Sequence, residues 1–226
     1  MRRRIFLDVG GHLGETLAVA VQPRWRFDRI WTFEPASECL PALRALADER
    51  VEVVPAGWWS SDTTLDLHEP GHLGASAATG TRRAGGAVET CRFIDAARWM
   101  AENIESTDTV WMKVNIEAAE VEVLRRLLDT GEIAKVDHLV VHFDIERVVD
   151  DQEHQADDMR RRLSEAGVSY REAPEVMFGR TRAAKTENWL AWTEAGRIER
   201  FRYVGARRAI HSARRQVFRV RRYLRR

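Results

Sequence analysis

The first two thirds of the chain alternate short apolar runs with segments whose apolar residues recur every three or four positions. Compact apolar runs predict strands, and the helical periodicity predicts helices that cover them. The predicted strands are residues 5–9, 29–35, 51–57, 60–69, 88–94, 109–115 and 138–144. The predicted helices are residues 16–22, 37–49, 95–103, 119–131 and 151–166. This order predicts parallel strands joined by right-handed crossovers, and therefore an open α/β sheet with helices on its faces.

The last third of the chain departs from this alternation. Residues 168–176 and 187–195 suggest a closing antiparallel pair, which is common at the edge of a parallel sheet. We therefore expect one domain over residues 1–196. Residues 197–226 differ in composition, since they contain twelve arginines and a single acid, Glu199. Their apolar residues are spaced three and four apart, which predicts an arginine-rich amphipathic helical tail.

Such a tail is compatible with several partners. It can dock on its own domain, on a twin subunit in a homodimer, on an anionic membrane surface or on a glycan-assembly protein. Nucleic acid is not expected as a partner, because the whole chain carries a formal net charge of only +1. These alternatives stay open at the level of sequence.

Composition narrows the class of protein. Cys39 and Cys91 are isolated thiols without CxxC spacing, which argues against a disulfide framework or a zinc site. No apolar stretch approaches the roughly 20 residues of a spanning helix, and the first residues lack the apolar core of a secretory leader. We therefore expect a cytoplasmic protein, with attachment to the inner face of the membrane through the tail as an alternative.

A glycine-rich turn, DVGGHLGET, follows the first predicted strand. A strand that leads through such a turn into a helix presents unpaired backbone amides at the sheet edge, where nucleotide-like ligands bind. Enzymes that bind dinucleotides space these glycines as GxGxxG, whereas this chain has Gly10-x-x-x-Gly14. Asp8 lies two residues before the first glycine. A carboxylate there disfavours a pyrophosphate and favours a ligand with an ammonium group.

The second predicted strand ends near Glu34, twenty residues after Gly14. A carboxylate in this position can accept hydrogen bonds from two ribose hydroxyls. An ammonium group beside the first strand and a ribose beside the second describe an amino acid joined to a nucleoside, which is S-adenosylmethionine. A purely structural glycine turn in an unrelated α/β protein is the alternative.

Four blocks of the sequence resemble the FkbM family of S-adenosylmethionine-dependent methyltransferases: DVGGHLGET, TFEPASECLPALRAL, VEVVPAGWWSSDTTLDLHE and VWMKVNIEAAEVEVLRRL. The resemblance implies a class I methyltransferase fold, a Rossmann-like three-layer α/β sandwich. Its mostly parallel sheet has seven strands, with an antiparallel strand at the edge. The resemblance also implies that S-adenosylmethionine is the cofactor and that no metal is required.

The resemblance carries the cofactor site onto particular residues. Asp8 and the glycines of the turn would hold the methionine end, Glu34 the ribose, and the stretch 56–62 the adenine, with Trp58 or Trp59 able to stack on the base. The residues assigned to the cofactor are Asp8, Gly10, Gly11, Gly14, Glu34, Ala56, Trp58, Asp62 and Asn115.

One block departs from the family pattern, which is close to K-[IV]-D-[IV]-E-G-x-E. This chain has Lys113, Glu117 and Glu120 in place, but Asn115 replaces the usual aspartate and Ala118 the usual glycine. Asn115 cannot act as a base; it can only orient a hydroxyl or the sulfonium ligand. Ala118 tolerates a positive φ poorly, where glycine adopts it readily.

Methyl transfer from a sulfonium is an in-line displacement, so the protein positions the acceptor oxygen and removes its proton. Side chains that follow two predicted strands are suited to both roles, and these are Asn115, Glu117, His142 and Asp144. We expect His142 to be the base, polarised by Asp144 or Glu117, because imidazole titrates near neutral pH. A buried structural role for His142, and a Mg²⁺ ion on the two carboxylates and Asn115, are the alternatives.

These features predict an S-adenosylmethionine-dependent O-methyltransferase. The expected acceptor is a hydroxyl of a sugar, a glycan or a glycosylated metabolite. A hydroxyl of a polyketide or another secondary metabolite is an alternative acceptor. A degenerate domain that binds the cofactor and serves as a scaffold is an alternative function, motivated by Asn115 and Ala118.

Overall fold

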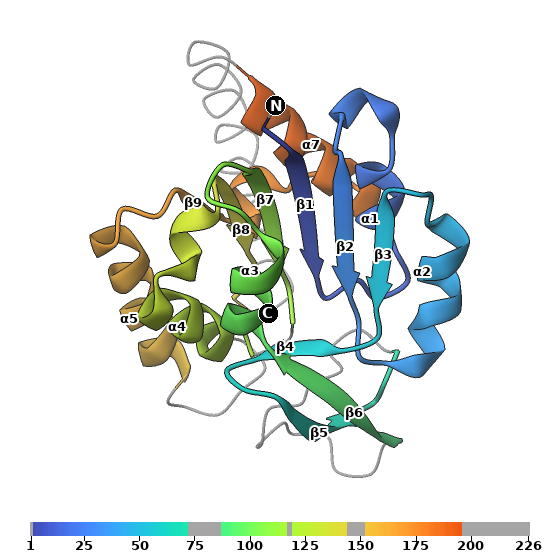
Figure 1. The fold of residues 1–226 in the computed structure, drawn as a ribbon, viewed down its shortest axis with the longest axis horizontal. Coiled ribbons are helices and arrows are strands. Elements are labelled where there is room, and N and C mark those ends of the chain that lie inside the picture. The colour runs from blue at the N-terminus through green and yellow to red at the C-terminus, as the bar shows by residue number, and fades with distance from the viewer. Residues whose placement is uncertain (1, 72–86, 117–118, 144–151, 196–226) are drawn as a thin grey trace, which may run out of the picture.

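A parallel β-sheet forms the centre of the fold (Figure 1). The structure, a computed structural model, describes residues 2–71, 87–116, 119–143 and 152–195. Within these ranges the sheet has six strands, which are, in spatial order, β3 (Val51–Val54), β2 (Arg29–Phe33), β1 (Arg4–Val9), β7 (Thr109–Val114), β8 (His138–Val141) and β9 (Tyr170–Glu172). Every neighbouring pair is parallel. The predicted α/β class with a mostly parallel sheet is therefore confirmed.

The strand order locates the place where a ligand is expected. Counted along the chain, the six strands are arranged 3-2-1-4-5-6, the order of dinucleotide-binding α/β folds. The order reverses between β1 and β7, and a crevice opens at such a reversal outside the carboxyl ends of the strands. Gly10 directly follows β1 and Asn115 directly follows β7, so the two residues meet at this point.

Helices cover both faces of the sheet and complete a three-layer sandwich (Figure 1). Ile5 and Leu7 of β1 pack on one face in a core shared with α3, α4 and α5, whereas Phe6 packs on the other in a core shared with α1, α2 and α7. The helices are α1 (Leu17–Ala20), α2 (Leu40–Leu46), α3 (Ala96–Asn103), α4 (Glu120–Thr130), α5 (Gln152–Glu165), α6 (Ala173–Val176) and α7 (Arg182–Glu194). Short 3₁₀ helices are η1 (Pro23–Trp25), η2 (Ser37–Cys39) and η3 (Glu132–Lys135).

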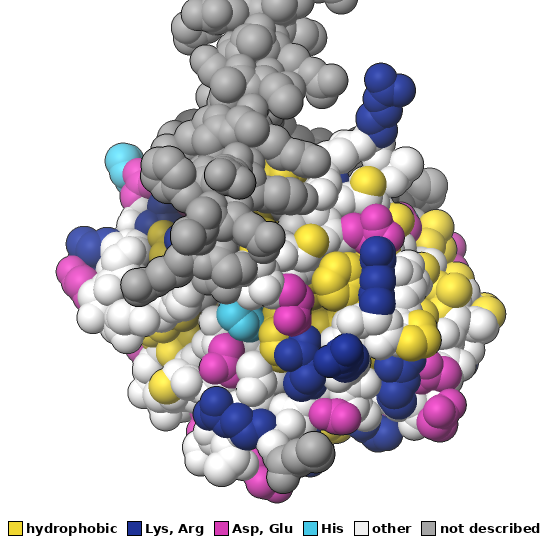
Figure 2. Space-filling view, turned by 90° about the horizontal axis from the view of Figure 1, so that it is seen from above, with side chains coloured by type: hydrophobic (Ala, Val, Ile, Leu, Met, Phe, Trp, Pro, Cys, Tyr) yellow, Lys and Arg dark blue, Asp and Glu magenta, His cyan; other side chains and the backbone are white. Residues whose placement is uncertain are grey.

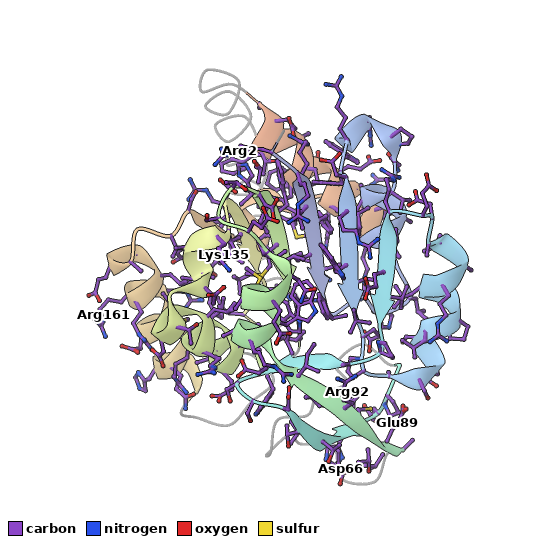
Figure 3. All side chains as sticks on the ribbon, in the orientation of Figure 1. Arg2, Asp66, Glu89, Arg92, Lys135 and Arg161 are labelled. Carbon is purple, nitrogen blue, oxygen red and sulfur yellow. The ribbon has the colours of Figure 1, made fainter. Side chains whose placement is uncertain are left out.

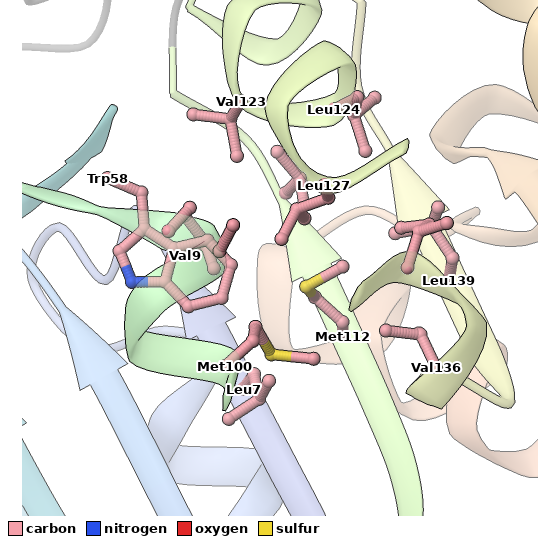
Figure 4. Close-up of a cluster of buried hydrophobic side chains, with 14 of the residues drawn as sticks. Leu7, Val9, Trp58, Met100, Met112, Val123, Leu124, Leu127, Val136 and Leu139 are labelled. Atoms are coloured by element: carbon pink, nitrogen blue, oxygen red, sulfur yellow. The ribbon is translucent and has the colours of Figure 1, made fainter. Parts of the chain in front are cut away.

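The core between the sheet and α3 and α4 is closely filled (Figure 4). Met100 of α3, Met112 of β7 and Leu127 of α4 lie together there, and each has an exposed fraction of 0%. Burying a side chain of this size contributes about 1.5–3 kcal/mol relative to leaving it in water. This core holds β1 and β7 in register, and the turns that follow both strands depend on it.

A second, smaller sheet lies beyond the carboxyl ends of β2 and β3 (Figure 1). Its strands are β4 (Gly57–Trp59), β6 (Val88–Asp95) and β5 (Thr63–His68), in this spatial order. Buried Cys39 and Cys91 belong to one apolar cluster that joins this sheet to the segment after β2. Burial raises the pKa of the Cys39 thiol to about 12 and that of Cys91 to about 11, so both thiols stay neutral. Figure 3 shows Asp66, Glu89 and Arg92 on the small sheet, far from Arg2.

The ends predicted for the helices 95–103, 119–131 and 151–166 agree with α3, α4 and α5. The Asp95 carboxylate accepts the amides of Ala97 and Arg98 at 2.9 and 3.2 Å, as an N-cap residue does. Gly131, at the end of α4, has φ of +79°, and Gly167, after α5, has φ of +69°. Both glycines adopt the left-handed conformation that commonly ends a helix.

The predicted antiparallel pair is wrong in the described part of the chain. β9 (Tyr170–Glu172) runs parallel to β8, and residues 187–194 belong to α7. Four residues of α7 are buried at helical spacing: Thr186, Trp189, Leu190 and Thr193. The aromatic residues suggested a strand, but Trp189 packs on Phe6 of β1 from a helix, with ring centroids 5.9 Å apart. The described sheet therefore has six parallel strands and lacks the expected antiparallel seventh.

The amino ends of the strands form the face shown in Figure 2. Basic, acidic and hydrophobic side chains are interspersed on the part of this face that is not drawn in grey. Arg3 and Asp108 illustrate the pairing of opposite charges, with Nη2 2.7 Å from Oδ2. None of the helices in the described ranges is long and apolar enough to cross a membrane. The predicted tail, residues 197–226, lies outside the described residues.

Candidate functional site

The glycine turn after β1 is hydrogen-bonded to β2 on one side and lies against the segment after β7 on the other. The amides of Gly10 and Gly11 donate to the Phe33 carbonyl of β2 at 3.1 and 3.0 Å. Gly10 has φ of +92°, and a Cβ atom there would lie 2.1 Å from the carbonyl oxygen of Asn115. Gly14 has φ of +89°. Glycine is therefore required at position 10 for its left-handed backbone and for the close approach of the segment after β7.

Replacing Gly10 by alanine is expected to lower the free energy of unfolding by more than about 2 kcal/mol, because the turn must move away from Asn115 and also bears the strain of a positive φ. Gly131→Ala is the matched control: its φ is +79°, and a Cβ atom there would have no neighbour within 4 Å. This control is expected to lose only about 1–2 kcal/mol. Urea unfolding of both variants measures the difference; equal losses would contradict the close approach.

A buried ion pair lies beneath the turn. Lys113 Nζ donates to Asp8 Oδ1 at 2.9 Å and to the Gly10 carbonyl at 2.7 Å. Asp8 is fully buried, and Lys113 is 8% exposed. Burial raises the pKa of the Asp8 carboxyl, and the charge of Lys113 opposes this effect. The cation that Asp8 was expected to attract is thus supplied by the chain itself, which favours a structural role for Asp8 over direct contact with a ligand.

Glu34 lies at the carboxyl end of β2, as predicted. Its two carboxylate oxygens accept the amides of His12 at 2.7 Å and Ala36 at 3.0 Å. The side chain is largely buried, and burial raises the pKa of the carboxyl, although the two amides work in the opposite direction. A carboxylate has about four acceptor positions, so two amides leave capacity for further hydrogen bonds.

Asn115 and His142 meet where β7 and β8 end. The Asn115 amide oxygen lies 2.8 Å from His142 Nδ1. An amide oxygen only accepts, so Nδ1 is the protonated nitrogen and Nε2 is the basic nitrogen of the neutral ring. The sequence predicted that both residues belong to the site; the structure adds that one orients the other.

A cavity of about 510 Å³ lies at the carboxyl ends of β1, β7 and β8. Its walls come from the glycine turn, from the two strand ends that carry Asn115 and His142, and from α6 and α7. The lining residues are Gly10, Gly11, His12, Glu15, Thr16, Lys113, Val114, Asn115, Val140, Val141, His142, Ala173, Pro174, Met177, Phe178, Gly179, Arg182, Lys185 and Thr186. The size is typical of a site for a small molecule.

The predicted adenine-side residues lie apart from this cavity. Ala56 is fully buried, and Trp58 is 1% exposed in the core, against Phe33 and Trp99. Figure 4 shows the Trp58 ring among the core side chains. Asp62 is half exposed and forms an ion pair with Arg98. These positions favour packing and surface roles for the three residues.

Three residues of the sequence prediction lie outside the described ranges: Glu117, Ala118 and Asp144. The roles expected for the two carboxylates, polarising His142 or holding Mg²⁺, stay predictions. Among the residues that the structure describes, no group of three histidine, cysteine or acidic side chains is placed to hold a metal ion.

The structure also brings residues to the site that the sequence did not assign to it. His12 Nε2 donates to the Gly71 carbonyl at 3.0 Å, and Nδ1 lies 3.3 Å from Glu15 Oε2, so the ring both fills the turn and lines the cavity. Arg182 comes from α7, far along the chain, and no local motif marks it. Lys113 does have a sequence signal, because a single lysine in an apolar strand implies a buried carboxylate partner.

Comparison with known proteins gives a family for this chain. A family model described as Methyltransferase FkbM domain matches residues 8–170, more than half of the sequence. A crystal structure of methyltransferase FkbM from Methylobacillus flagellatus aligns with a TM-score of 0.46 and 17% identity, over 73% of this chain and 38% of that chain. No curated protein matches the sequence. On the family match, the chain belongs to the FkbM methyltransferase domain family.

Proposed function

We propose that this protein is an S-adenosylmethionine-dependent O-methyltransferase that acts on a hydroxyl of a sugar or a glycan. The observation that carries the proposal is the cavity in which the glycine turn after β1 faces the Asn115–His142 pair. A methyl donor on the turn and a hydroxyl beside the imidazole would lie in one cavity.

The residues at the turn fit the cofactor. Gly10 and Gly11 line the cavity, and the left-handed Gly10 lets the turn approach the Asn115 backbone closely, which brings the turn next to the end of β7. Glu34 accepts the His12 amide at the rim of the turn and has acceptor capacity for ribose hydroxyls. Lys113 lines the cavity and would face the methionine end, whereas Asp8 holds Lys113 in place by a hydrogen bond from beneath the turn.

The chemistry required of the protein is proton removal and alignment. S-adenosylmethionine supplies a methyl group whose bond to sulfur breaks as its bond to the acceptor oxygen forms, with the electron pair left on sulfur. His142 Nε2 takes the hydroxyl proton, and Asn115 holds the ring in the tautomer that can do so. Fixing the acceptor near the donor contributes through orientation.

Calorimetric titration with S-adenosylmethionine and S-adenosylhomocysteine tests the cofactor. Binding of both at micromolar to millimolar concentration is the expected result, and no binding of either would overturn the proposal. Methyl transfer from labelled cofactor is then measured on sugars, nucleotide-sugars and oligosaccharides, with polyketide hydroxyls as the second panel. Cofactor binding without transfer to any panel would favour the scaffold function that Asn115 suggested.

Glu34→Ala is expected to weaken binding of S-adenosylhomocysteine by roughly 100-fold or more, because two hydrogen bonds to a charged acceptor are lost. Glu52→Ala removes a carboxylate from the neighbouring strand β3, where Glu52 pairs with Arg29, and serves as the control. Thermal unfolding of both variants checks that the turn at His12 survives. Unchanged affinity in a folded Glu34→Ala protein would refute the ribose assignment.

A further inference from the structure

The cavity has one wall, formed by α6 and α7, that the cofactor assignment does not use. Arg182 and Lys185 line this wall three residues apart, so they lie on one side of α7. Both lie in the first turn of the helix, whose partial positive charge adds to theirs. The wall is therefore the cationic side of the cavity.

The described residues that line the cavity carry little negative charge to balance this wall. Among its lining residues, Glu15 is the one carboxylate within the described part of the chain. Glu15 Oε1 accepts from Arg182 at 2.8 Å, and Oε2 lies 3.3 Å from His12 Nδ1. Although burial alone would raise its pKa, the hydrogen bonds and Arg182 outweigh burial and lower the pKa of Glu15. Glu15 thus stays ionised and neutralises Arg182.

Lys185 is left as an uncompensated charge on the wall. It is exposed, it lines the cavity, and no carboxylate in the described ranges forms an ion pair with it. Lys113 does not add to the excess, because Asp8 neutralises it. The described lining residues consequently carry close to one net positive charge, located on α7 rather than at the glycine turn.

Other residues of the cavity lining are apolar. Met177 and Phe178 contribute apolar side chains from the segment between α6 and α7, and Val141 contributes one from β8. Apolar lining with a few polar groups is typical of pockets that orient a small molecule. The polar groups here include the imidazole of His142 and the ammonium group of Lys185.

We propose that the methyl acceptor carries an anionic substituent, a carboxylate or a phosphate on a sugar, which pairs with Lys185 while the hydroxyl to be methylated faces His142. This inference rests on the proposed function for the identity of the reaction, but not for the anion site. Arg182, held by Glu15, flanks the anion and fixes its direction.

Binding of three sugars tests the inference without any methyl transfer. Glucuronate, glucose 6-phosphate and glucose are titrated into the full-length protein saturated with S-adenosylhomocysteine, and into the protein alone. Lys185→Met is expected to weaken binding of the charged sugars by roughly 10- to 100-fold, since a hydrogen bond to a charged group is removed. Whichever charged sugar binds more tightly distinguishes a carboxylate from a phosphate.

Arg180→Met is the matched control. Arg180 is exposed, lies just before α7 and is absent from the cavity wall, so its removal takes away the same charge without touching the site. Glu15→Gln is expected to have the opposite effect on affinity. It removes the carboxylate that neutralises Arg182, so binding of the charged sugars is expected to tighten several-fold. Arg180→Met is not expected to change binding of glucose.

Three results would overturn the anion site: no preference for the charged sugars over glucose, equal weakening by Lys185→Met and Arg180→Met, or no binding of any charged sugar at tens of millimolar. Failure of the proposed function looks different, since it appears as loss of S-adenosylhomocysteine binding while the charged sugars still bind in a Lys185-dependent way.

Discussion

Lys113→Met is expected to lower the free energy of unfolding by about 3–5 kcal/mol, because it leaves the fully buried Asp8 carboxylate without its counter-charge. The loss includes the second hydrogen bond of Lys113, to the Gly10 carbonyl, so the glycine turn loosens as well. Urea unfolding followed by tryptophan fluorescence measures the change. A loss below about 1 kcal/mol would contradict a buried, tightly coupled pair.

The loss of unfolding free energy in Lys113→Met is expected to depend on pH. Burial raises the pKa of Asp8 in the folded protein, and removing Lys113 raises it further. A carboxyl whose pKa is raised in the folded state favours the folded state when it is protonated. Its contribution to stability is complete below the unfolded-state pKa of about 4 and is lost as the pH rises through the folded-state pKa. The deficit of Lys113→Met relative to the wild type is therefore larger at pH about 8 than at pH about 5.

A double variant distinguishes the effect of the unpaired charge on stability from the effect of altered packing. Asp8→Asn combined with Lys113→Met removes both charges, so no buried ion is left uncompensated. It is expected to recover most of the stability that the single variant loses and to lose the pH dependence. A double variant as unstable as Lys113→Met would show that packing around Lys113, rather than the ion pair, is responsible.

His142→Gln is expected to lower the rate of methyl transfer by roughly 10²- to 10⁴-fold, the contribution of a general base, with little change in S-adenosylhomocysteine affinity. Glutamine keeps a polar side chain of similar length, so the fold around Asn115 is retained and thermal unfolding checks this. Initial rates with a labelled cofactor and a saturating acceptor give the comparison. A decrease of less than tenfold would assign His142 a structural role instead.

Asn115 is a positioning residue in this scheme, and a pH profile distinguishes that role from a merely structural one. Asn115→Asp places a carboxylate 2.8 Å from His142 Nδ1, which favours the imidazolium. The basic form of the ring then appears only at higher pH, so the rise of the transfer rate with pH is expected to shift upward by roughly one unit or more. An unshifted profile would contradict the Asn115–His142 contact as an element of catalysis.

Some features of the site were predictable because they are local. Glycine at position 10 follows from the strand-turn-helix pattern, Glu34 from the end of the next strand, and the Asp95 and Gly131 helix ends from the chemistry of capping. The α/β class followed from the alternation of strands and helices. Each of these conclusions depends on residues within a few positions of one another.

Other features depend on which elements pack together. The same aromatic residues suit a strand or a helix, and only the packing of Trp189 on Phe6 decided that residues 187–194 form α7 rather than a sheet edge. The sequence places Trp58 directly after the predicted strand 51–57, where a ligand-facing residue would lie, yet in the structure Trp58 belongs to β4 and its ring packs into the core.

The sequence by itself determined the family, through four blocks that resemble it. It also determined the parallel α/β architecture and the placing of Gly10, Glu34, Asn115 and His142 at the carboxyl ends of strands, because period and spacing act along the chain. Only the tertiary structure decided that Lys113 neutralises Asp8, that Asn115 orients His142, and that α7 brings Lys185 to the cavity. The partners in these contacts are far apart in the sequence, by 105 residues for Lys113 and Asp8 and by 167 for Arg182 of α7 and Glu15. Such pairings follow from strand order and helix packing, which no local pattern encodes.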